Sequence, residues 1–139
     1  MADRAARAER FGVQIEAVDR GSALAILRPA ASTPQDPEAS LLALAQTSAA
    51  AAVDSAISTI LEQVDRRTTH SSITYFRPAR GAVSAVALVQ REYSDALTHE
   101  IRTAGTTECR VDVALVDEWG ETVAQGFFDV VVARRSPAA

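Results

Sequence analysis

The feature that most constrains the fold is a long stretch, from Glu38 to about Val64, that has the periodicity of an α-helix. Its apolar residues recur every three or four positions, which gathers them on one side of a helix. Four consecutive alanines, Ala49 to Ala52, lie near its centre. Small side chains let another layer approach closely, so the pattern predicts a helix wrapped by a sheet. The recurring apolar residues are Leu42, Ala45, Ala49, Val53, Ala56, Ile60 and Val64.

Segments with the alternation of half-buried β-strands lie on both sides of this helix. Their short connections require mainly antiparallel pairing, so we expect one antiparallel sheet and one dominant helix. One strand is apolar on both faces, which predicts a central strand covered on both sides. The expected strands are residues 13–18, 23–27, 69–76, 83–92 (the strand apolar on both faces), 109–116 and 122–132, with a short helix at 94–105 that begins at Ser94 as N-cap and ends at Gly105.

A chain of 139 residues has room for one domain. Its 47% hydrophobic and 23% charged residues are typical of a globular protein with a sizeable core. We therefore predict a single domain over residues 1–139. Within it we expect residues 1–10 to form an N-terminal helix or arm and residues 134–139 to form a loose tail.

The residue types that are missing exclude several kinds of chemistry. The chain has no lysine, so a Schiff-base amine and a P-loop lysine are impossible. A single cysteine, Cys109, excludes an internal disulfide and a CxxC redox pair, and two histidines make a metal site improbable. The net charge of −4, without a basic cluster, gives no reason to expect a nucleic-acid partner. We predict neither a metal nor a cofactor.

Membrane insertion and export are not expected either. The longest nearly apolar stretch, Leu41 to Val53, is interrupted by polar residues and is shorter than the ~20 residues that a membrane span needs. The first ten residues carry charges of mixed sign and no apolar core, unlike a secretory signal. The sequence therefore predicts a cytoplasmic protein with no membrane partner.

Two segments carry a resemblance to a known family. The first is ITYFRPARG, from Ile73 to Gly81, and the second is VALVDEWGETVAQG, from Val113 to Gly126. In this order and at this spacing they resemble the hotdog-fold thioesterases, and most closely their phenylacetyl-CoA-thioesterase-like branch. The resemblance extends over roughly residues 11–132. It implies an α+β hotdog fold, in which an antiparallel β-sheet wraps around one long central α-helix.

The resemblance also implies how such a protein would work. It suggests a homodimer or a dimer of dimers (a homotetramer) that binds acyl-CoA, or another acyl-carrier thioester, at the subunit interface. Members of the branch place a catalytic acid on the central helix, and this position falls on Gln46. Pro37-Glu38-Ala39 stands where the branch has His-Gly-Gly. A neutral amide cannot abstract a proton at pH 7, so Gln46 can only orient water or hydrogen-bond to a ligand.

The same resemblance indicates two further catalytic candidates. Thr68 falls where relatives may place a helping hydroxyl, and the helix-start amides near Ser40 are the candidate oxyanion site. Asp54 is the obvious carboxylate on the helix, seven residues beyond Thr47 and on the same face. A solvated surface charge is the alternative role for Asp54, as it is for Asp36 and Glu38. For Gln46 the alternative is a buried amide that hydrogen-bonds across a dimer.

The candidates for binding the substrate are Ser40 and Thr47 on the helix and, after it, His70, Arg77 and Arg80. His70 is expected on the same strand face as Thr68 and Ser72, where it is either a base or a histidine satisfied within the strand. Arg77 and Arg80 flank Pro78 at a strand end, where they could hold a CoA phosphate or lie on the surface as ordinary exposed arginines.

The predicted function is therefore that of an acyl-CoA thioesterase-like protein, a possible hydrolase that cleaves or binds an acyl thioester at a dimer interface. Because Gln46 replaces the acid and His-Gly-Gly is missing, two alternatives stay open. One is a catalytically silent hotdog protein that binds acyl-CoA or a related ligand. The other is a structural or partner-binding dimer, since a fold alone specifies no chemistry.

Overall fold

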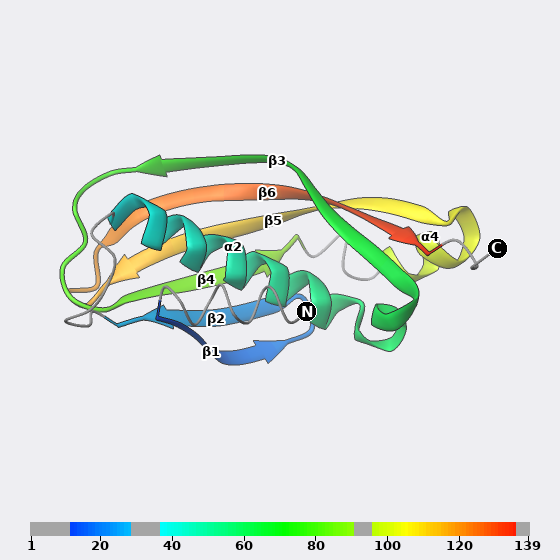
Figure 1. The fold of residues 1–139 in the computed structure, drawn as a ribbon, viewed down its shortest axis with the longest axis horizontal. Helices are drawn as coiled ribbons and strands as arrows, with labels where there is room; N and C mark the ends of the chain where they lie inside the picture. Colours follow the sequence, from blue (N-terminus) through cyan, green and yellow to red (C-terminus); the bar gives the residue numbers. More distant parts are fainter. Residues whose placement is uncertain (1–11, 29–36, 91–95, 136–139) are drawn as a thin grey trace.

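The computed structural model describes residues 12–28, 37–90 and 96–135, so the helix or arm predicted at residues 1–10 lies outside the described residues. A six-stranded sheet and one long helix make up most of the fold (Figure 1). In chain order, the elements are β1 (Val13–Asp19), β2 (Ser22–Leu27), α2 (Pro37–Ala56), η1 (Ser58–Gln63), β3 (Val64–Tyr75), β4 (Val83–Val89), α4 (Leu97–Ala104), β5 (Thr106–Asp117) and β6 (Thr122–Arg134).

Helix α2 begins close to its predicted start and ends earlier than predicted. It has 20 residues, and such a helix is about 30 Å long. The predicted continuation to Val64 is wrong, because residues 58–63 form the 3₁₀-helix η1 and Val64 begins β3. Ile57, Ile60 and Val64 are buried all the same. Apolar residues spaced three or four apart fit a 3₁₀ turn as well as an α-helix, so the pattern did not reveal the change of backbone.

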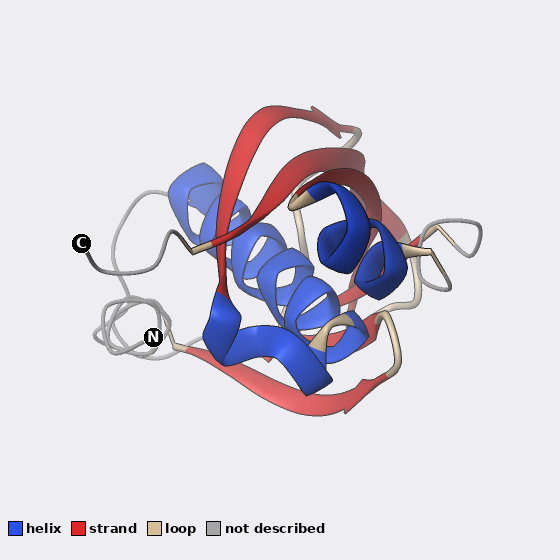
Figure 2. Ribbon diagram, turned by 90° about the vertical axis from the view of Figure 1, so that its right-hand side faces the viewer, coloured by secondary structure: helices blue, strands red, loops and turns tan. Residues whose placement is uncertain are grey.

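The strands form one sheet in the order β1-β2-β4-β5-β6-β3, and every neighbouring pair is antiparallel. Both predicted hairpins are present, as β1 with β2 and β5 with β6. Viewed from one end of the molecule, the strands curve around the helix (Figure 2). Helix α2 packs against β1, β2, β4 and β5. The prediction of an antiparallel sheet wrapped around one long helix is thus confirmed.

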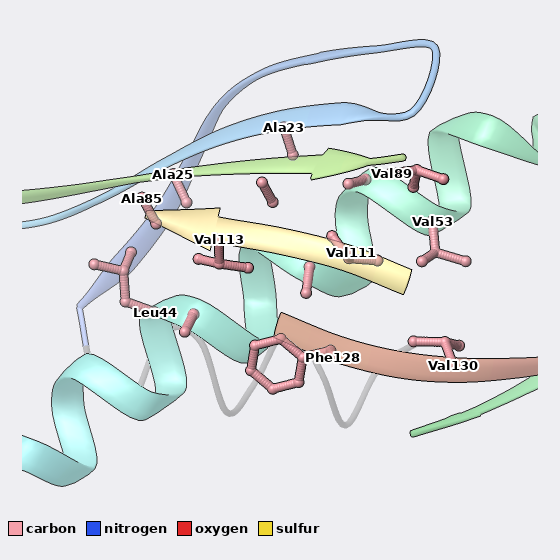
Figure 3. Close-up of a cluster of buried hydrophobic side chains, with 14 of the residues drawn as sticks. Ala23, Ala25, Leu44, Val53, Ala85, Val89, Val111, Val113, Phe128 and Val130 are labelled. Carbon is pink, nitrogen blue, oxygen red and sulfur yellow. The ribbon is translucent and has the colours of Figure 1, made fainter. Parts of the chain in front are cut away.

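The core lies between α2 and the concave side of the sheet, which we call the inner face. Side chains alternate along β4 and β5, and every second residue is buried on this face. Opposite the helix alanines, β2 and β4 contribute further alanines, whose small size allows the helix to approach these strands. Larger side chains from β5 and β6 fill the rest (Figure 3). The buried residues include Ala23, Ala25, Leu44, Ala45, Ala49, Ala52, Val53, Ala85, Val89, Val111, Val113, Phe128 and Val130.

Strand β4 is central, as predicted, but it is covered on one face only. It lies between β2 and β5 in the sheet. Its inner residues, such as Ala85, are buried, whereas Val86 and Leu88 on the convex outer face are each about half exposed. The prediction that β4 is covered on both faces is therefore wrong for the single chain. Apolar residues on both faces of the strand suggested a second covering layer, and the described residues of one chain contain none on the outer face.

The second helix and the C-terminal strand differ from prediction in their boundaries. Helix α4 ends at Gly105 in a left-handed conformation, as predicted, but its N-cap is Ala96 and not Ser94. The predicted tail begins too early, because β6 continues to Arg134 and the Arg135 side chain contacts Asp65 at 2.9 Å. Among the described helices, none is long and apolar enough to cross a lipid bilayer.

Gly126 marks a close approach of two strands. It lies in β6, opposite Ile73 of β3 on one side and Val113 of β5 on the other. A Cβ atom at this position would lie 2.0 Å from the backbone oxygen of Ser72 and 2.9 Å from the Cα of Ile73. Only glycine fits there without displacing the backbone of β3.

Candidate functional site

One side of α2 faces away from the strands that it packs against. Residues four apart on a helix share a side, so Leu42, Gln46, Ala50 and Asp54 form one stripe. Leu42 and Gln46 are exposed, whereas Ala50 and Asp54 are half-buried. Asp54 reaches β3 through an ion pair with Arg66, which fixes the direction of this stripe. The stripe therefore points toward the β3 side of the sheet.

Strand β3 is the edge strand on that side, and its inner face is largely exposed. Thr68 pairs with buried Val130 of β6, and Ser71 pairs with buried Phe128. Directly opposed residues of an antiparallel pair point to the same face, so Thr68 and Ser71 are on the inner face. Ile73 and Tyr75 follow on that face. We call the α2 stripe and these four β3 residues the open face.

The predicted helix residues occupy different environments. Gln46 is exposed on the open face, in the third turn of α2, and Thr47 beside it is half-buried. Ser40 is buried in the first turn, at the positive end of the helix dipole. The position of Gln46 suits contact with a ligand or with another chain, and it does not suit the buried amide of the alternative prediction within a single chain.

Asp54 is held by a cation. The Arg66 Nε lies 2.7 Å from Asp54 Oδ1, and Arg66 Nη2 donates to Asp54 Oδ2 at 3.4 Å. Both side chains are mostly buried, with exposed fractions of 13% for Arg66 and 18% for Asp54. A carboxylate engaged by a guanidinium is not available as a general base, so this contact does not support the catalytic role predicted for Asp54. Arg66 is the partner of a candidate site residue, and the sequence interpretation did not single it out.

A β-bulge separates Thr68 from His70. The register with β6 shifts between these residues, so Thr69 is the extra residue of β3. His70 then pairs with Asp129 and Ser72 with Phe127, on the outer face of the sheet. The predicted common face of Thr68, His70 and Ser72 is therefore wrong, because one inserted residue reverses the alternation. His70 lies across the sheet from the open face, and a substrate contact there gains no support.

On the outer face, His70 belongs to a row of polar side chains. Asp129 accepts hydrogen bonds from Arg110 Nε at 2.8 Å and from Nη2 at 3.0 Å, and Arg110 stacks on the ring of Phe127. The hydrogen bonds from Arg110 lower the pKa of Asp129, and the Arg110 and His70 charges act in the same direction, against the effect of burial. This pair is a structural counterpart, on the opposite face, of the pair between Asp54 and Arg66.

Arg77 and Arg80 lie in the loop between β3 and β4, which is fastened to the turn between β5 and β6. Arg77 Nη1 contacts Glu121 Oε2 at 2.8 Å. The Arg80 carbonyl accepts from the Glu118 N–H at 3.1 Å, and the Arg80 N–H donates to Asp117 Oδ2 at 3.3 Å. Both arginine residues are exposed. The start of α2, the end of β3 and this loop lie at the same end of the molecule (Figure 1).

Asp117 organises this end. Its Oδ1 accepts from the backbone N–H groups of Trp119 at 3.0 Å and Glu121 at 3.2 Å, beside the bond from Arg80. Burial acts to raise the pKa of Asp117, but these three N–H groups and the Arg80 charge outweigh it and lower the pKa below its usual value of 3.8. The sequence identified this segment as a turn and did not identify its organising carboxylate.

The lowered pKa of Asp117 predicts a loss of stability in acid. The ionised form is favoured in the folded state, so its contribution is fully present above the unfolded value of 3.8 and is lost as the pH falls through the folded value. We expect the melting temperature of the wild type, measured between about pH 6 and pH 2, to fall more steeply than that of Asp117→Asn. Asp129 contributes to both curves. If the melting temperatures of the two proteins fell in parallel with pH, Asp117 would not be the source of the acid sensitivity.

The only cysteine is buried and unreactive. Cys109 lies in β5 with 1% of its surface exposed. Burial, together with the charges of Asp129 and Glu108, raises the pKa of the thiol from 9.0 to about 11. The thiol therefore stays protonated at neutral pH and is a packing group, as the sequence suggested.

Metal ligation gains no support from the described part of the chain. In residues 12–28, 37–90 and 96–135, no three His, Cys, Asp or Glu side chains lie together in a way that could hold a metal ion. What the open face offers a ligand is hydrogen-bonding groups. These are the amide of Gln46, the hydroxyls of Thr68 and Ser71, and the ion pair of Asp54 with Arg66.

Comparison with known proteins finds similarity in structure alone. No protein-family model and no curated protein sequence matches the chain. A probable thioesterase of unknown function from Pseudomonas aeruginosa superposes with a TM-score of 0.79 at 20% identity, over 94% of this chain and 88% of that chain. The E. coli PaaI protein, from the phenylacetic acid degradation operon, gives 0.69 at 21% identity, over 97% and 92%. A hypothetical thioesterase from Streptococcus pneumoniae, solved with coenzyme A, gives 0.64 at 19% identity, over 98% and 99%.

These similarities show the fold. The chain has the hotdog fold of thioesterase-like proteins, and the match to PaaI agrees with the predicted resemblance to the phenylacetyl-CoA-thioesterase-like branch. The matches cover nearly the whole chain. At 19–21% identity they establish the architecture and not the chemistry.

Proposed function

We propose that the chain binds an acyl-CoA thioester on its open face and hydrolyses it slowly. The observation that supports this most is that the inner face of β3 and the first half of the α2 stripe are exposed, with the ion pair of Asp54 and Arg66 joining the two elements, in a fold that holds coenzyme A in the Streptococcus pneumoniae thioesterase. Gln46 and Thr68 come from these two elements. The exposed polar groups there are unusual for the concave face of this sheet, whose buried side chains on the described strands are almost all apolar.

Each of three regions has a role in the proposed site. Arg77 and Arg80, at the end of β3, would hold the phosphates of CoA. Gln46 would orient a water molecule or the thioester carbonyl, and Thr68 would donate or accept a hydrogen bond there. The first turn of α2, near Ser40, would stabilise negative charge on the carbonyl oxygen as the tetrahedral intermediate forms.

Hydrolysis on this face would be slow, because water must attack without a carboxylate to take its proton. Gln46 is neutral and Asp54 is held by Arg66. The same observation favours the second candidate function, a binding protein that holds an acyl-CoA without turning it over. The two candidate functions involve the same ligand and the same face, and they differ only in whether the thioester is hydrolysed.

We also propose that two copies of the chain meet at the open face. The outer edge of β3, twelve residues long, has no neighbouring strand among the described residues, and such an edge can pair with another strand. Leu42 and Tyr75 on the open face are 37% and 39% exposed. A second copy would cover these side chains and enclose the ligand. The cytoplasm, predicted from the sequence, remains the proposed compartment.

The oligomeric state has a direct measurement. Light scattering at micromolar concentration should give at least twice the mass of one chain. Replacing a β3 residue with proline should shift the mass toward one chain, because proline cannot donate a hydrogen bond to an added strand. Ser71 is exposed and provides such a position: the Phe76 N–H donates to Val123 of β6, and by alternation the Ser71 N–H points to the free edge. A wild-type mass of one chain would contradict the dimer.

Ligand binding is tested with CoA and a panel of short, medium, long and aromatic acyl-CoAs. A ligand that binds only the folded state raises the free energy of unfolding, by about 2.7 kcal/mol when it is present at 100 times its Kd. The melting temperature rises as a result. Chromatography of released CoA then measures turnover. Shifts with turnover would support a thioesterase, and shifts without turnover a binding protein. No shift with any member of the panel would contradict both and favour a structural or partner-binding dimer.

A further inference from the structure

We infer that the ion pair of Asp54 with Arg66 recognises a hydrogen-bonding group at the far end of the acyl moiety. The ligand would then be an acyl-CoA whose acyl end carries a hydroxyl or carbonyl oxygen, in preference to a plain alkyl chain. This inference rests on the proposed function, because it assumes that CoA binds on the open face.

The pair lies in line with the other parts of the proposed site. Strand β3 and helix α2 run in opposite directions (Figure 1). Arg77 and Arg80 follow the end of β3, near the start of α2, whereas Arg66 and Asp54 belong to the start of β3 and the end of α2. A thioester at Gln46 with its CoA directed toward Arg77 must direct its acyl group the other way. That direction leads to Asp54 and Arg66.

The separation suits a short or medium acyl group. Asp54 is eight residues beyond Gln46, which corresponds to about 12 Å along the helix. Arg66 precedes Thr68 by two residues, about 7 Å along the strand. Ala50, between Gln46 and Asp54, contributes only a methyl group to this path. The pair therefore stands where such a chain would end.

The pair retains capacity for a ligand. A guanidinium has five N–H donors; Nη2 of Arg66 donates to Asp54 at 3.4 Å, while Nε lies 2.7 Å from Oδ1 as an ion pair without hydrogen-bond geometry. With 13% and 18% exposure, both groups are mostly withdrawn from water and keep a small exposed part. An alkyl end placed against them would remove their remaining water without replacing its hydrogen bonds. A hydroxyl or carbonyl oxygen would replace them, which is how a polar site discriminates between such ligands.

A purely structural role is the competing explanation, and the chain contains a matched control for it. Arg110 and Asp129 form the same type of pair, at 2.8 Å, on the outer face. Removing that pair should affect stability alone. Removing the pair of Asp54 with Arg66 should change which ligand is preferred.

The experiment compares non-hydrolysable acyl-CoA thioethers that differ only in a terminal hydroxyl, over several chain lengths, by calorimetry. The proteins are the wild type, Asp54→Asn, the double variant Asp54→Leu with Arg66→Leu, and the control Asp129→Asn. The double variant keeps the position filled with apolar groups, a replacement that ion pairs of low exposure often tolerate. CoA itself, without an acyl group, measures binding that does not involve the pair.

We expect the wild type and Asp129→Asn to prefer the hydroxylated ligand by about tenfold at the best chain length, as one hydrogen bond to a charged group provides. The double variant should lose or reverse this preference and bind CoA as the wild type does. Equal binding of both ligands by the wild type, or an unchanged preference in the double variant, would overturn the inference while leaving the proposed function intact. Failure of the wild type to bind CoA or any thioether would overturn both.

Discussion

Replacing Gln46 with aspartate is expected to raise hydrolysis of the bound acyl-CoA by about 10²- to 10⁴-fold, the range that a positioned general base contributes. Gln46 is exposed on the open face of the single chain, so an aspartate there should leave the fold of the chain intact. It would supply the proton acceptor that the wild type lacks. Release of CoA, followed by chromatography at several acyl-CoA concentrations, gives kcat and KM separately, and the gain should appear in kcat.

A matched variant tests whether the position or merely the added charge matters. Ala50→Asp places the same carboxylate on the same stripe, one turn further along α2, and should bring no gain in kcat; it should weaken binding, because Ala50 lines the proposed path of the acyl group. Gln46→Ala should weaken binding or turnover if the amide touches the ligand. If neither Gln46 variant changes binding or rate, Gln46 does not belong to the site.

Replacing Gly126 with alanine is expected to cost about 3–5 kcal/mol in the free energy of unfolding. The added Cβ would lie 2.0 Å from the backbone oxygen of Ser72 and 2.9 Å from the Cα of Ile73. Both atoms belong to the backbone of β3, so no side-chain rotation can relieve the contact. β3 must shift away from β6, which breaks the pairing that holds the open face in shape. Urea unfolding, with the midpoint and slope fitted together, measures the cost.

Gly120 provides the comparison. It has a positive φ of 81° in the turn between β5 and β6, and a Cβ there would meet nothing within 4 Å. Gly120→Ala should therefore cost only the backbone conformational penalty, about 1–2 kcal/mol. Equal costs for the two variants would show that β3 moves away easily, and the rigidity assigned here to the edge strand would be wrong.

The fold was predictable because its signals are local and agree with one another. The alanine-rich period of α2, the alternation in β4 and β5 and the capping glycine at Gly105 each specify one element, and short connections specify antiparallel pairing. The errors fall where local pattern is ambiguous. Ile57 and Ile60 keep a helical spacing across the change to a 3₁₀ turn, and the apolar outer residues of β4 say nothing about what covers them.

The site was less predictable, since its geometry depends on events that no short window of sequence records. The bulge at Thr69 moves His70 to the outer face, and nothing in the run of polar residues marks where the extra residue lies. The partner of Asp54 is Arg66, which lies twelve residues further along the chain in β3, where helical spacing no longer relates the two residues. The positions of Gln46 and Thr68 came from the family resemblance, and the structure places them on the two elements that border the open face.

Because Cys109 is buried, the reaction of its thiol can report the opening of the sheet. A single thiol that is 1% exposed, with its pKa raised to about 11, should react with a thiol reagent only when β5 separates from its neighbours. The labelling rate in the native state would then give the free energy of the opening that exposes the sheet centre, with no engineered probe. Because native protein should scarcely label, colorimetric detection of released CoA with thiol reagents remains usable on the folded protein.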